Sequence, residues 1–413
     1  MIRDRKPHVE IVYFNAGGGH RAAAMALADS IRLSGFDWHV ELVQLQELLQ
    51  SLDPIYQTMG FHSEELYNRA LKRGWTYGSK TFLRVLQQGI SIEAPAFRRR
   101  LRDWWSRRAP DLAVSVVPNF NRIMFEALRE AHPHTPFVTI MTDFADVPPH
   151  FWMERQDQHI VCGTRKAALQ AALSGFYRPE CIHEVSGMIV RPRFYAAAGA
   201  KPSLTREQLG LDPQGKVALV MFGGYGSEES GEVITHLGRL GVSSILMCGR
   251  NEQLLESCRD RPGVHAVGFT ERVEDYMRLA DFFVGKPGPG SISEALLMGL
   301  PVIVTSNSRT MIQERYNVTW VEEQGVGLGI AGYRQLDEAV RYLLTGDCLA
   351  GYRRRAASLA NRAVFELPPL LRRILDGHER GDVTTSAILS HPGHDDLSAQ
   401  PSRVTLGASQ GIT

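Results

Sequence analysis

Cysteine is scarce in this sequence, and the cysteines that occur form no motif. The 413-residue chain has five of them, and no two are arranged as Cys-x-x-Cys. A disulfide framework or a cysteine-ligated zinc site would need closely spaced cysteines. The spacing therefore excludes both and favours a reducing compartment. The five are Cys162, Cys181, Cys248, Cys258 and Cys348.

Long apolar runs and an excess of charge are missing as well. No run approaches the ~18–20 residues of a membrane span, and Met1–Glu10 contains no signal-peptide core. The net charge is +1, so the overall charge gives no reason to expect a nucleic-acid partner. We therefore expect a cytoplasmic protein whose contact with a membrane, at the inner face of the cell membrane, is peripheral.

Strand-like and helix-like segments alternate along the chain, which predicts an α/β protein. Each half begins with a strand, a glycine loop and a helix, and the two opening strands are His8–Phe14 and Val217–Phe222. We predict two Rossmann-like domains that face a cleft, over residues 1–200 and 201–376. The small residues of Ala196–Pro202 would form the hinge. Residues 377–413 have little apolar content and would be a disordered tail.

The most informative stretch is Ala280–Glu314, which is predicted to be strand, glycine loop, helix and strand. Ser291 would be the helix N-cap, with Glu294 three residues later as in a capping box. The free amides of the loop and first helical turn suit a diphosphate, and Glu294 could instead accept hydrogen bonds from a ribose. An ordinary turn with a capping box is the alternative. The loop lacks the Gly-Lys-Ser/Thr of a Walker A motif, which argues against a P-loop NTPase.

A second glycine loop precedes His20, which opens the first predicted helix. The helix dipole lowers a histidine pKa there and favours a neutral imidazole that could act as a general base. A histidine that only hydrogen-bonds at the helix start is the alternative. Gly17, Gly19 and Ala22 also fit the loose G-x-G-x-x-A pattern of dinucleotide-binding enzymes. A dinucleotide-dependent oxidoreductase and a catalytically silent binding protein therefore stay open.

Pro95–Arg108 is predicted to be a helix with aromatic residues on one face and arginines around it. Phe97, Trp104 and Trp105 lie on that face. Basic residues around aromatics suit an anionic membrane surface. The alternative is a helix that packs its aromatic face on the core.

Four separated segments, in the right order, carry a resemblance to glycosyltransferase family 28, closest to the monogalactosyldiacylglycerol synthases. They are Gly17–Ala24, Phe137–Trp152, Gly187–Phe194 and Lys286–Pro301, the last with Gln313 and Glu314 beyond it. The resemblance implies the GT-B fold, with the acceptor in the first domain and a UDP-sugar in the second.

The resemblance also implies roles for particular residues. His20 and Asp143 would be catalytic. Glu294 would hold the ribose, Gln313 and Glu314 would reach the hexose, and Phe269-Thr270 would read uracil through backbone atoms. The other donor-binding candidates are Gly223, Gly224, Gly226, Lys286, Pro287, Gly288, Gly290 and Ser291. The acceptor-binding candidates are Gly18, Gly19, Asn119, Phe120 and Trp152.

The implied reaction is inverting transfer of galactose or glucose from a UDP-hexose to the hydroxyl of diacylglycerol, which makes a glycolipid. Transfer of N-acetylglucosamine to a polyprenyl-linked or lipopolysaccharide acceptor is the alternative within the same class. No Asp-x-Asp motif occurs, so we expect no metal and no cofactor, the UDP-sugar being a substrate. Anionic lipids are an expected partner surface.

Overall fold

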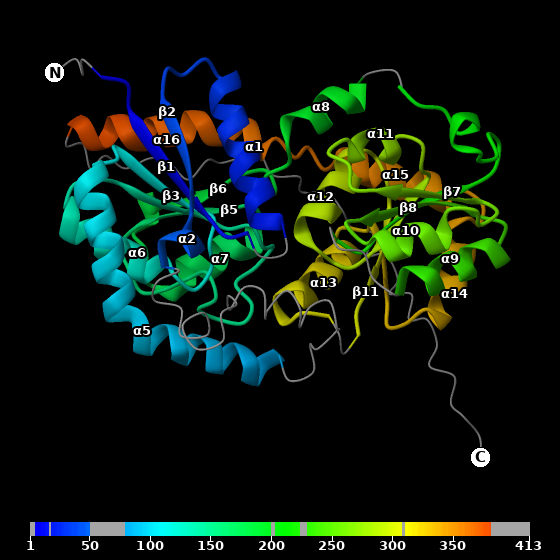
Figure 1. Ribbon diagram of the computed structural model, residues 1–413, viewed down its shortest axis with the longest axis horizontal. Coiled ribbons are helices and arrows are strands. Elements are labelled where there is room, and N and C mark those ends of the chain that lie inside the picture. The colour runs from blue at the N-terminus through cyan, green and yellow to red at the C-terminus, as the bar shows by residue number, and fades with distance from the viewer. Residues whose placement is uncertain are drawn as a thin grey trace, which may run out of the picture.

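The structure is a computed structural model in which residues 5–15, 18–49, 79–199, 203–223, 229–307 and 310–380 are described (Figure 1). Side chains are described over the same ranges except 79–89, 91 and 378–380. Nearly all of the predicted tail lies outside these ranges, and so do residues 50–78.

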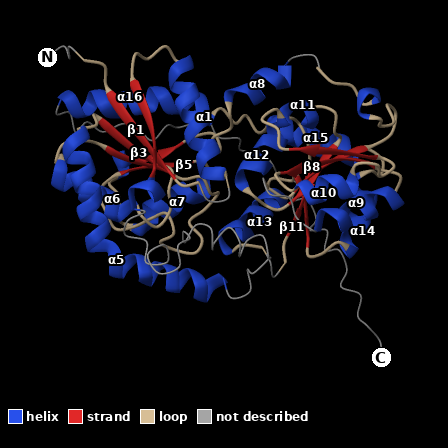
Figure 2. Cartoon of the chain, viewed as in Figure 1, coloured by secondary structure: helices blue, strands red, loops and turns tan. Residues whose placement is uncertain are grey.

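Two six-stranded sheets, all of whose paired strands run parallel, organise the chain (Figure 2). The first has the order β2-β1-β3-β4-β5-β6, and the second β12-β11-β10-β7-β8-β9. We call each sheet with its helices the first and second unit. The prediction of an α/β protein built from two Rossmann-like halves is confirmed. In the first unit the strands are β1 (His8–Tyr13), β2 (His39–Gln44), β3 (Leu112–Ser115), β4 (Phe137–Ile140), β5 (His159–Cys162) and β6 (Ile182–Glu184). In the second they are β7 (Val217–Met221), β8 (Ser243–Gly249), β9 (Val264–Gly268), β10 (Phe282–Gly285), β11 (Val302–Thr305) and β12 (Gly327–Ile330).

Helices flank both sheets (Figures 1 and 2). Because both faces are covered, the strands β3, β10 and β11 are buried along their whole length and are mostly apolar. The helices of the first unit are α1 (Gly19–Leu33), α2 (Leu45–Leu49), α5 (Ser79–Arg108), α6 (Asn121–Ala131) and α7 (Arg165–Ser174). Helix α8 (Pro192–Gly199) contacts both units, and its Phe194 is buried in the core of the second. Those that follow are α9 (Glu229–Arg239), α10 (Glu252–Cys258), α11 (Val273–Met277), α12 (Pro289–Leu297), α13 (Arg315–Glu323), α14 (Arg334–Leu343), α15 (Cys348–Ser358) and α16 (Ala363–Arg380).

Three short strands, β5, β6 and β12, are not predicted from the sequence. They have three or four residues each, too few to show a periodic pattern. In β12 the glycines are required by close packing, because a Cβ on Gly327 would lie 2.0 Å from the carbonyl oxygen of Val302. A sequence that looks like a turn is therefore an edge strand.

The prediction of a hinge over Ala196–Pro202 is wrong for residues 196–199, which are helical. Helix α8 continues to Gly199, since its run of alanines favours helix. Residues 200–202 lie outside the described part. The helix predicted over Leu204–Leu211 is reduced to one 3₁₀ turn at Glu207–Leu209.

The last helix, α16, returns to the first unit, where it packs beside α1 (Figure 1). Its buried Leu367, Leu371 and Ile374 belong to the same apolar cluster as β1 and β3. The helix continues through Pro368, which has no N–H for the carbonyl of Val364. The Ser30 hydroxyl of α1 donates to that carbonyl instead. The range 201–376 thus contains a helix whose core contacts lie in the first unit.

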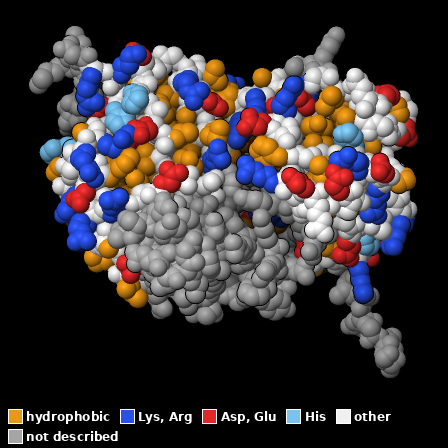
Figure 3. Space-filling model, in the orientation of Figure 1, with side chains coloured by type: hydrophobic (Ala, Val, Ile, Leu, Met, Phe, Trp, Pro, Cys, Tyr) orange, Lys and Arg blue, Asp and Glu red, His pale blue; other side chains and the backbone are white. Residues whose placement is uncertain are grey.

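Helix α5 begins at Ser79, earlier than the predicted Pro95, and its aromatic face packs on the core. Phe97, Leu101 and Trp105 are buried against the first sheet. Arg98 of the same helix forms ion pairs with Glu126 and Glu130. The core-packing interpretation of this face holds, because those aromatics fill the interior. Among the described helices, none is long and apolar enough to cross a membrane. Positive and negative side chains are interspersed over the face shown in Figure 3.

Candidate active site

His20 lies in the first turn of α1, after Gly18 in the left-handed conformation with φ 82°. Its Nδ1 lies 3.1 Å from the hydroxyl oxygen of Thr142, a residue in the loop after β4. Burial lowers the pKa of His20 to about 4, against the opposing effect of a hydrogen bond with the Val116 backbone. The imidazole is therefore neutral at neutral pH, as predicted, and desolvation is the largest cause.

Asp143 is 6% exposed and follows the same strand. The indole N–H of Trp152 donates to its Oδ2 over 2.8 Å. Burial raises the pKa of Asp143 to about 7, against the Trp152 hydrogen bond. The charge of Glu314 raises the pKa further, and that of Lys286 opposes it. Both of those residues belong to the second unit, so Asp143 lies where the two units meet.

An apolar contact closes the same junction. The ring of Phe144 lies 4.4 Å from that of Trp320 in α13, centroid to centroid. Ile312, from the second unit, belongs to the same buried cluster as Met141 and Trp152 of the first. The loops that follow β4 and β11 therefore pack directly on each other.

The predicted acceptor-binding residues divide into two groups. Gly18 and Gly19 are exposed. Phe120 is buried against Phe14, 5.3 Å away by ring centroids. Trp152 is wholly buried and acts as support for Asp143. Asn119, with φ 64°, donates its backbone N–H to the carbonyl of Phe151 over 2.8 Å. Phe120 and Trp152 are thus buried, whereas Gly18 and Gly19 are open to solvent.

Asp146 is a positioning residue that the sequence did not single out. It is 5% exposed and accepts backbone N–H bonds from His150 at 2.8 Å and Trp152 at 2.7 Å. These bonds hold the loop that carries Trp152. The sequence Asp-x-Pro-Pro could have indicated this role, because an aspartate before a proline turn commonly binds backbone amides.

Several of the predicted donor-binding residues lie around an ion pair between Lys286 and Glu314. Lys286 Nζ lies 2.9 Å from Oε1 of Glu314, whose side chain is 6% exposed. A Cβ on Gly223 or on Gly288 would lie 3.6 Å from Lys286 Cε, so both glycines border the pair. Four of the predicted donor residues therefore come together. Gln313 precedes Glu314 in the chain and donates to the Met311 sulfur over 3.5 Å. Gly224 and Gly226 lie outside the described residues.

Asn317 is a second positioning residue that the sequence did not reveal. It is fully buried in α13 and donates its side-chain N–H to the carbonyl of Pro287 over 2.7 Å. The glycine loop after β10 is thereby attached to α13. No local pattern predicts this contact, because the two residues are distant in sequence.

The predicted capping box at Ser291 is wrong. Helix α12 begins two residues earlier, at Pro289, with Gly288 as N-cap and no side-chain cap. Proline suits the first helical position because its missing N–H is not needed there. Glu294 therefore lies in the second turn, free of a capping role. Gly290 and Ser291 lie in the first turn, where the backbone amides are free to bind an anion.

Arg191 and Arg193 act electrostatically on Glu294. Burial raises the pKa of Glu294 to about 7, while the charges of Arg191 and Arg193 lower it. Both arginines come from the Gly187–Phe194 segment, just before and within α8. The segment was recognised in the sequence, but its arginines were not named as site residues.

Phe269 and Thr270 follow β9. Phe269 is 59% exposed, with the Arg250 guanidinium 4.8 Å from its ring centroid. Thr270 accepts a hydrogen bond from the Arg272 backbone through its hydroxyl over 3.0 Å. Its own side chain therefore stabilises the turn.

Residues 235–362 match the glycosyltransferase family 28 C-terminal domain. Over 385 residues the chain is 31% identical to a probable monogalactosyldiacylglycerol synthase 2, chloroplastic, of Oryza sativa subsp. indica. The match covers 87% of this chain and 79% of that one. The chain belongs to the monogalactosyldiacylglycerol synthase family. It is 29% identical over 353 residues to the chloroplastic monogalactosyldiacylglycerol synthase of Spinacia oleracea, covering 80% of this chain and 65% of the other.

Solved structures give the same fold at low identity. The lipopolysaccharide-biosynthesis glycosyltransferase WaaG matches with a TM-score of 0.53 at 17% identity, over 90% of this chain and 100% of that one. The calicheamicin glycosyltransferase CalG4 matches with a TM-score of 0.55 at 15% identity, over 91% and 98%. The GT-B fold is therefore confirmed.

Family membership makes this chain a UDP-sugar-dependent glycosyltransferase, and the dinucleotide-dependent oxidoreductase is not supported. The predicted location is wrong. The synthase relatives are chloroplastic plant proteins, which overturns the expectation of a cytoplasmic enzyme at the inner face of the cell membrane. A compartment is set by signals apart from the core, so composition and missing motifs predict it poorly.

Proposed function

We propose that this protein transfers galactose from UDP-galactose to the free hydroxyl of diacylglycerol and forms a β-galactolipid. The names of the relatives support the sugar and the lipid. The single observation that carries the site is the electrostatic contact of Asp143, in the first unit, with Lys286 and Glu314 in the second. Donor-side and acceptor-side candidates meet across the junction.

The donor would bind along the second unit. The first-turn amides of α12 and the Lys286 ammonium would face the diphosphate, and Glu294 would accept hydrogen bonds from the ribose hydroxyls. Gln313 and Glu314 would reach the galactose. The ammonium and the helix dipole supply positive charge for the leaving group, so we propose that neither a metal nor a cofactor takes part in the transfer.

The acceptor would approach from the first unit. The neutral His20 would take the proton of the acceptor hydroxyl as its oxygen attacks the anomeric carbon. The bond from that carbon to the UDP oxygen breaks, and UDP leaves from the opposite face with inversion. Asp143 would orient the acceptor hydroxyl. Because diacylglycerol resides in a bilayer, the enzyme would work at a membrane surface, with anionic lipids as candidate neighbours.

A direct assay tests the proposal. Purified protein would be incubated with radiolabelled UDP-galactose, UDP-glucose or UDP-N-acetylglucosamine and with diacylglycerol or polyprenyl phosphate in mixed micelles. We expect a galactolipid from the first donor and diacylglycerol, and its loss in His20→Ala. Product formed only with polyprenyl phosphate would show that the acceptor is not diacylglycerol. Product formed only from UDP-glucose would show that the transferred sugar is glucose.

A further inference from the structure

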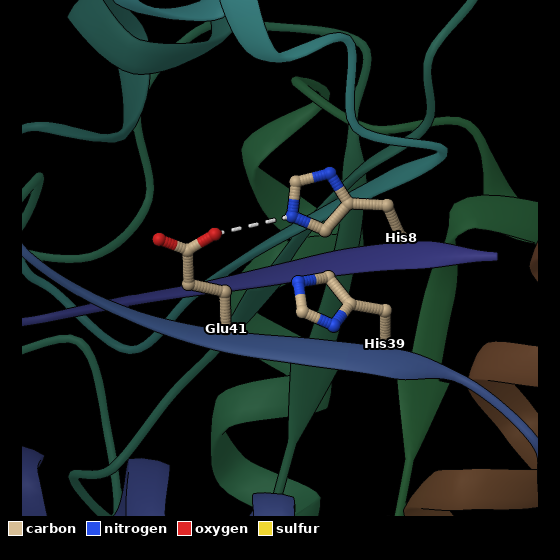
Figure 4. Close-up of side chains that lie close together, drawn as sticks. All are labelled: His8, His39 and Glu41. Carbon is tan, nitrogen blue, oxygen red and sulfur yellow. Dashed lines mark hydrogen bonds and ion pairs between the residues drawn. The ribbon is translucent and has the colours of Figure 1, made fainter. Parts of the chain in front are cut away.

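The amino ends of β1 and β2 bring metal-binding side chains together. Their parallel register places His8 beside His39 and Glu10 beside Glu41. Side chains two residues apart on a strand point to the same face. Two imidazoles and two carboxylates therefore share one face of the sheet, and three of them lie close together in Figure 4.

The spacing of these groups suits a small cation. One ligand atom from each of His8, His39 and Glu41 lies within 4.8 Å of the other two. His8 Nε2 and Glu41 Oε2 are 3.3 Å apart. Zinc–nitrogen bonds of ~2.0–2.1 Å in tetrahedral geometry put neighbouring ligand atoms about 3.3–3.5 Å apart. One pair already has that separation, and the exposed His39 can turn toward it.

The surrounding charges favour a cation at Glu41. Glu10 is fully buried, and Arg108 Nε donates to its Oε1 over 2.9 Å. Trp105 Nε1 donates to the other oxygen of Glu10 over 3.0 Å. Arg108 also contacts Oε2 of Glu41, the oxygen that faces His8, so a bound ion would share this carboxylate with the guanidinium. Two carboxylates and one guanidinium leave one negative charge, and Glu41 is the 30%-exposed carboxylate that a cation can reach.

We propose that His8, His39 and Glu41 bind one Zn²⁺ ion, with a water molecule from solvent as the fourth ligand. Two imidazoles and one carboxylate form a ligand set that zinc accepts. The ion would tie the edge strand β2 to β1. His8 begins a six-residue strand, so the ion lies about 20 Å before the loop that leads to His20. The ion would therefore lie away from the proposed catalytic groups.

Zinc titration of the full-length protein tests the site. Protein stripped with EDTA would be titrated with ZnCl₂ in a calorimeter, and its tetrahedral Co²⁺ spectrum would be recorded. We expect one equivalent to bind and zinc to raise the melting temperature. His39→Ala and Glu41→Gln should lose both effects. His134→Ala, which removes an exposed histidine elsewhere in the first unit, is the matched control and should keep them.

Two results would overturn the site. One is a parent protein that binds no zinc, and the other is a His39→Ala protein that binds zinc as the parent does. His39 is exposed, so far-UV circular dichroism should show that this variant folds. Transferase turnover should be the same with and without zinc. A loss of turnover on stripping that His39→Ala does not reproduce would place the ion elsewhere.

Discussion

Trp152 donates its indole N–H to Oδ2 of Asp143 over 2.8 Å. The same ring lies 5.9 Å from the imidazole of His20, centroid to centroid. One fully buried side chain therefore contacts both proposed catalytic groups. The loop that carries it is held by Asp146. A change in that loop would alter the two catalytic side chains together.

Asp143→Asn should raise stability while lowering turnover. The folded pKa is about 7 and the unfolded one about 3.9, so the native state binds more protons between those values and loses stability as pH rises through them. Asparagine removes this cost, which is at most a few kcal/mol at pH 8. Melting temperatures of the two proteins should be similar near pH 4, diverge as the pH rises from 4 to 7, and differ by a constant amount above that. A less stable variant at pH 8 would contradict the raised pKa.

His20→Ala should lower kcat about 10²–10⁴-fold if the imidazole takes the acceptor proton. Affinity for the UDP-sugar should change little, because the donor contacts lie in the other unit. Steady-state kinetics with both substrates, beside a circular dichroism control, measure this. Weakened donor binding would instead make His20 a donor-binding residue.

The pH dependence of kcat tells the two candidate bases apart. A base must be unprotonated, so the rate falls as pH drops below its pKa. With His20 as base, whose pKa burial lowers to about 4, the rate should hold to about pH 5. With Asp143, whose pKa is raised to about 7, it should fall below pH 7. We expect the first profile, and a fall that disappears in Asp143→Asn would assign the base to Asp143.

Glu294→Gln should weaken donor binding. A carboxylate that accepts two ribose hydroxyls makes charge-assisted bonds worth about 1.5–3 kcal/mol, or roughly 10- to 150-fold in affinity. Calorimetry with UDP measures the change. Glu232→Gln, at an exposed glutamate in the first turn of α9, is the control and should bind UDP normally. Equal affinities in both variants would remove Glu294 from the donor site.

Thermal shift assays should separate nucleotide classes. UDP at 100 times its dissociation constant should stabilise the fold by about 2.7 kcal/mol through linkage. NADH at the same concentration should leave the melting temperature unchanged, since no oxidoreductase site is expected. Stabilisation by NADH but not by UDP would overturn the proposal that the donor is a UDP-sugar.

The sequence determined the strand–glycine loop–helix units, the two α/β halves and the donor segment around Lys286, because these depend on local patterns and short-range sterics. It placed the N-cap of α12 at Ser291 and not at Gly288, since propensity alone does not fix a helix start within a few residues. Only the tertiary structure decided that Trp152 is buried under Asp143 and that Arg191 lies near Glu294. It also paired His8 with His39, residues that strand register alone brings together. Such contacts join residues far apart in the chain, and the packing that selects them depends on both sheets at once.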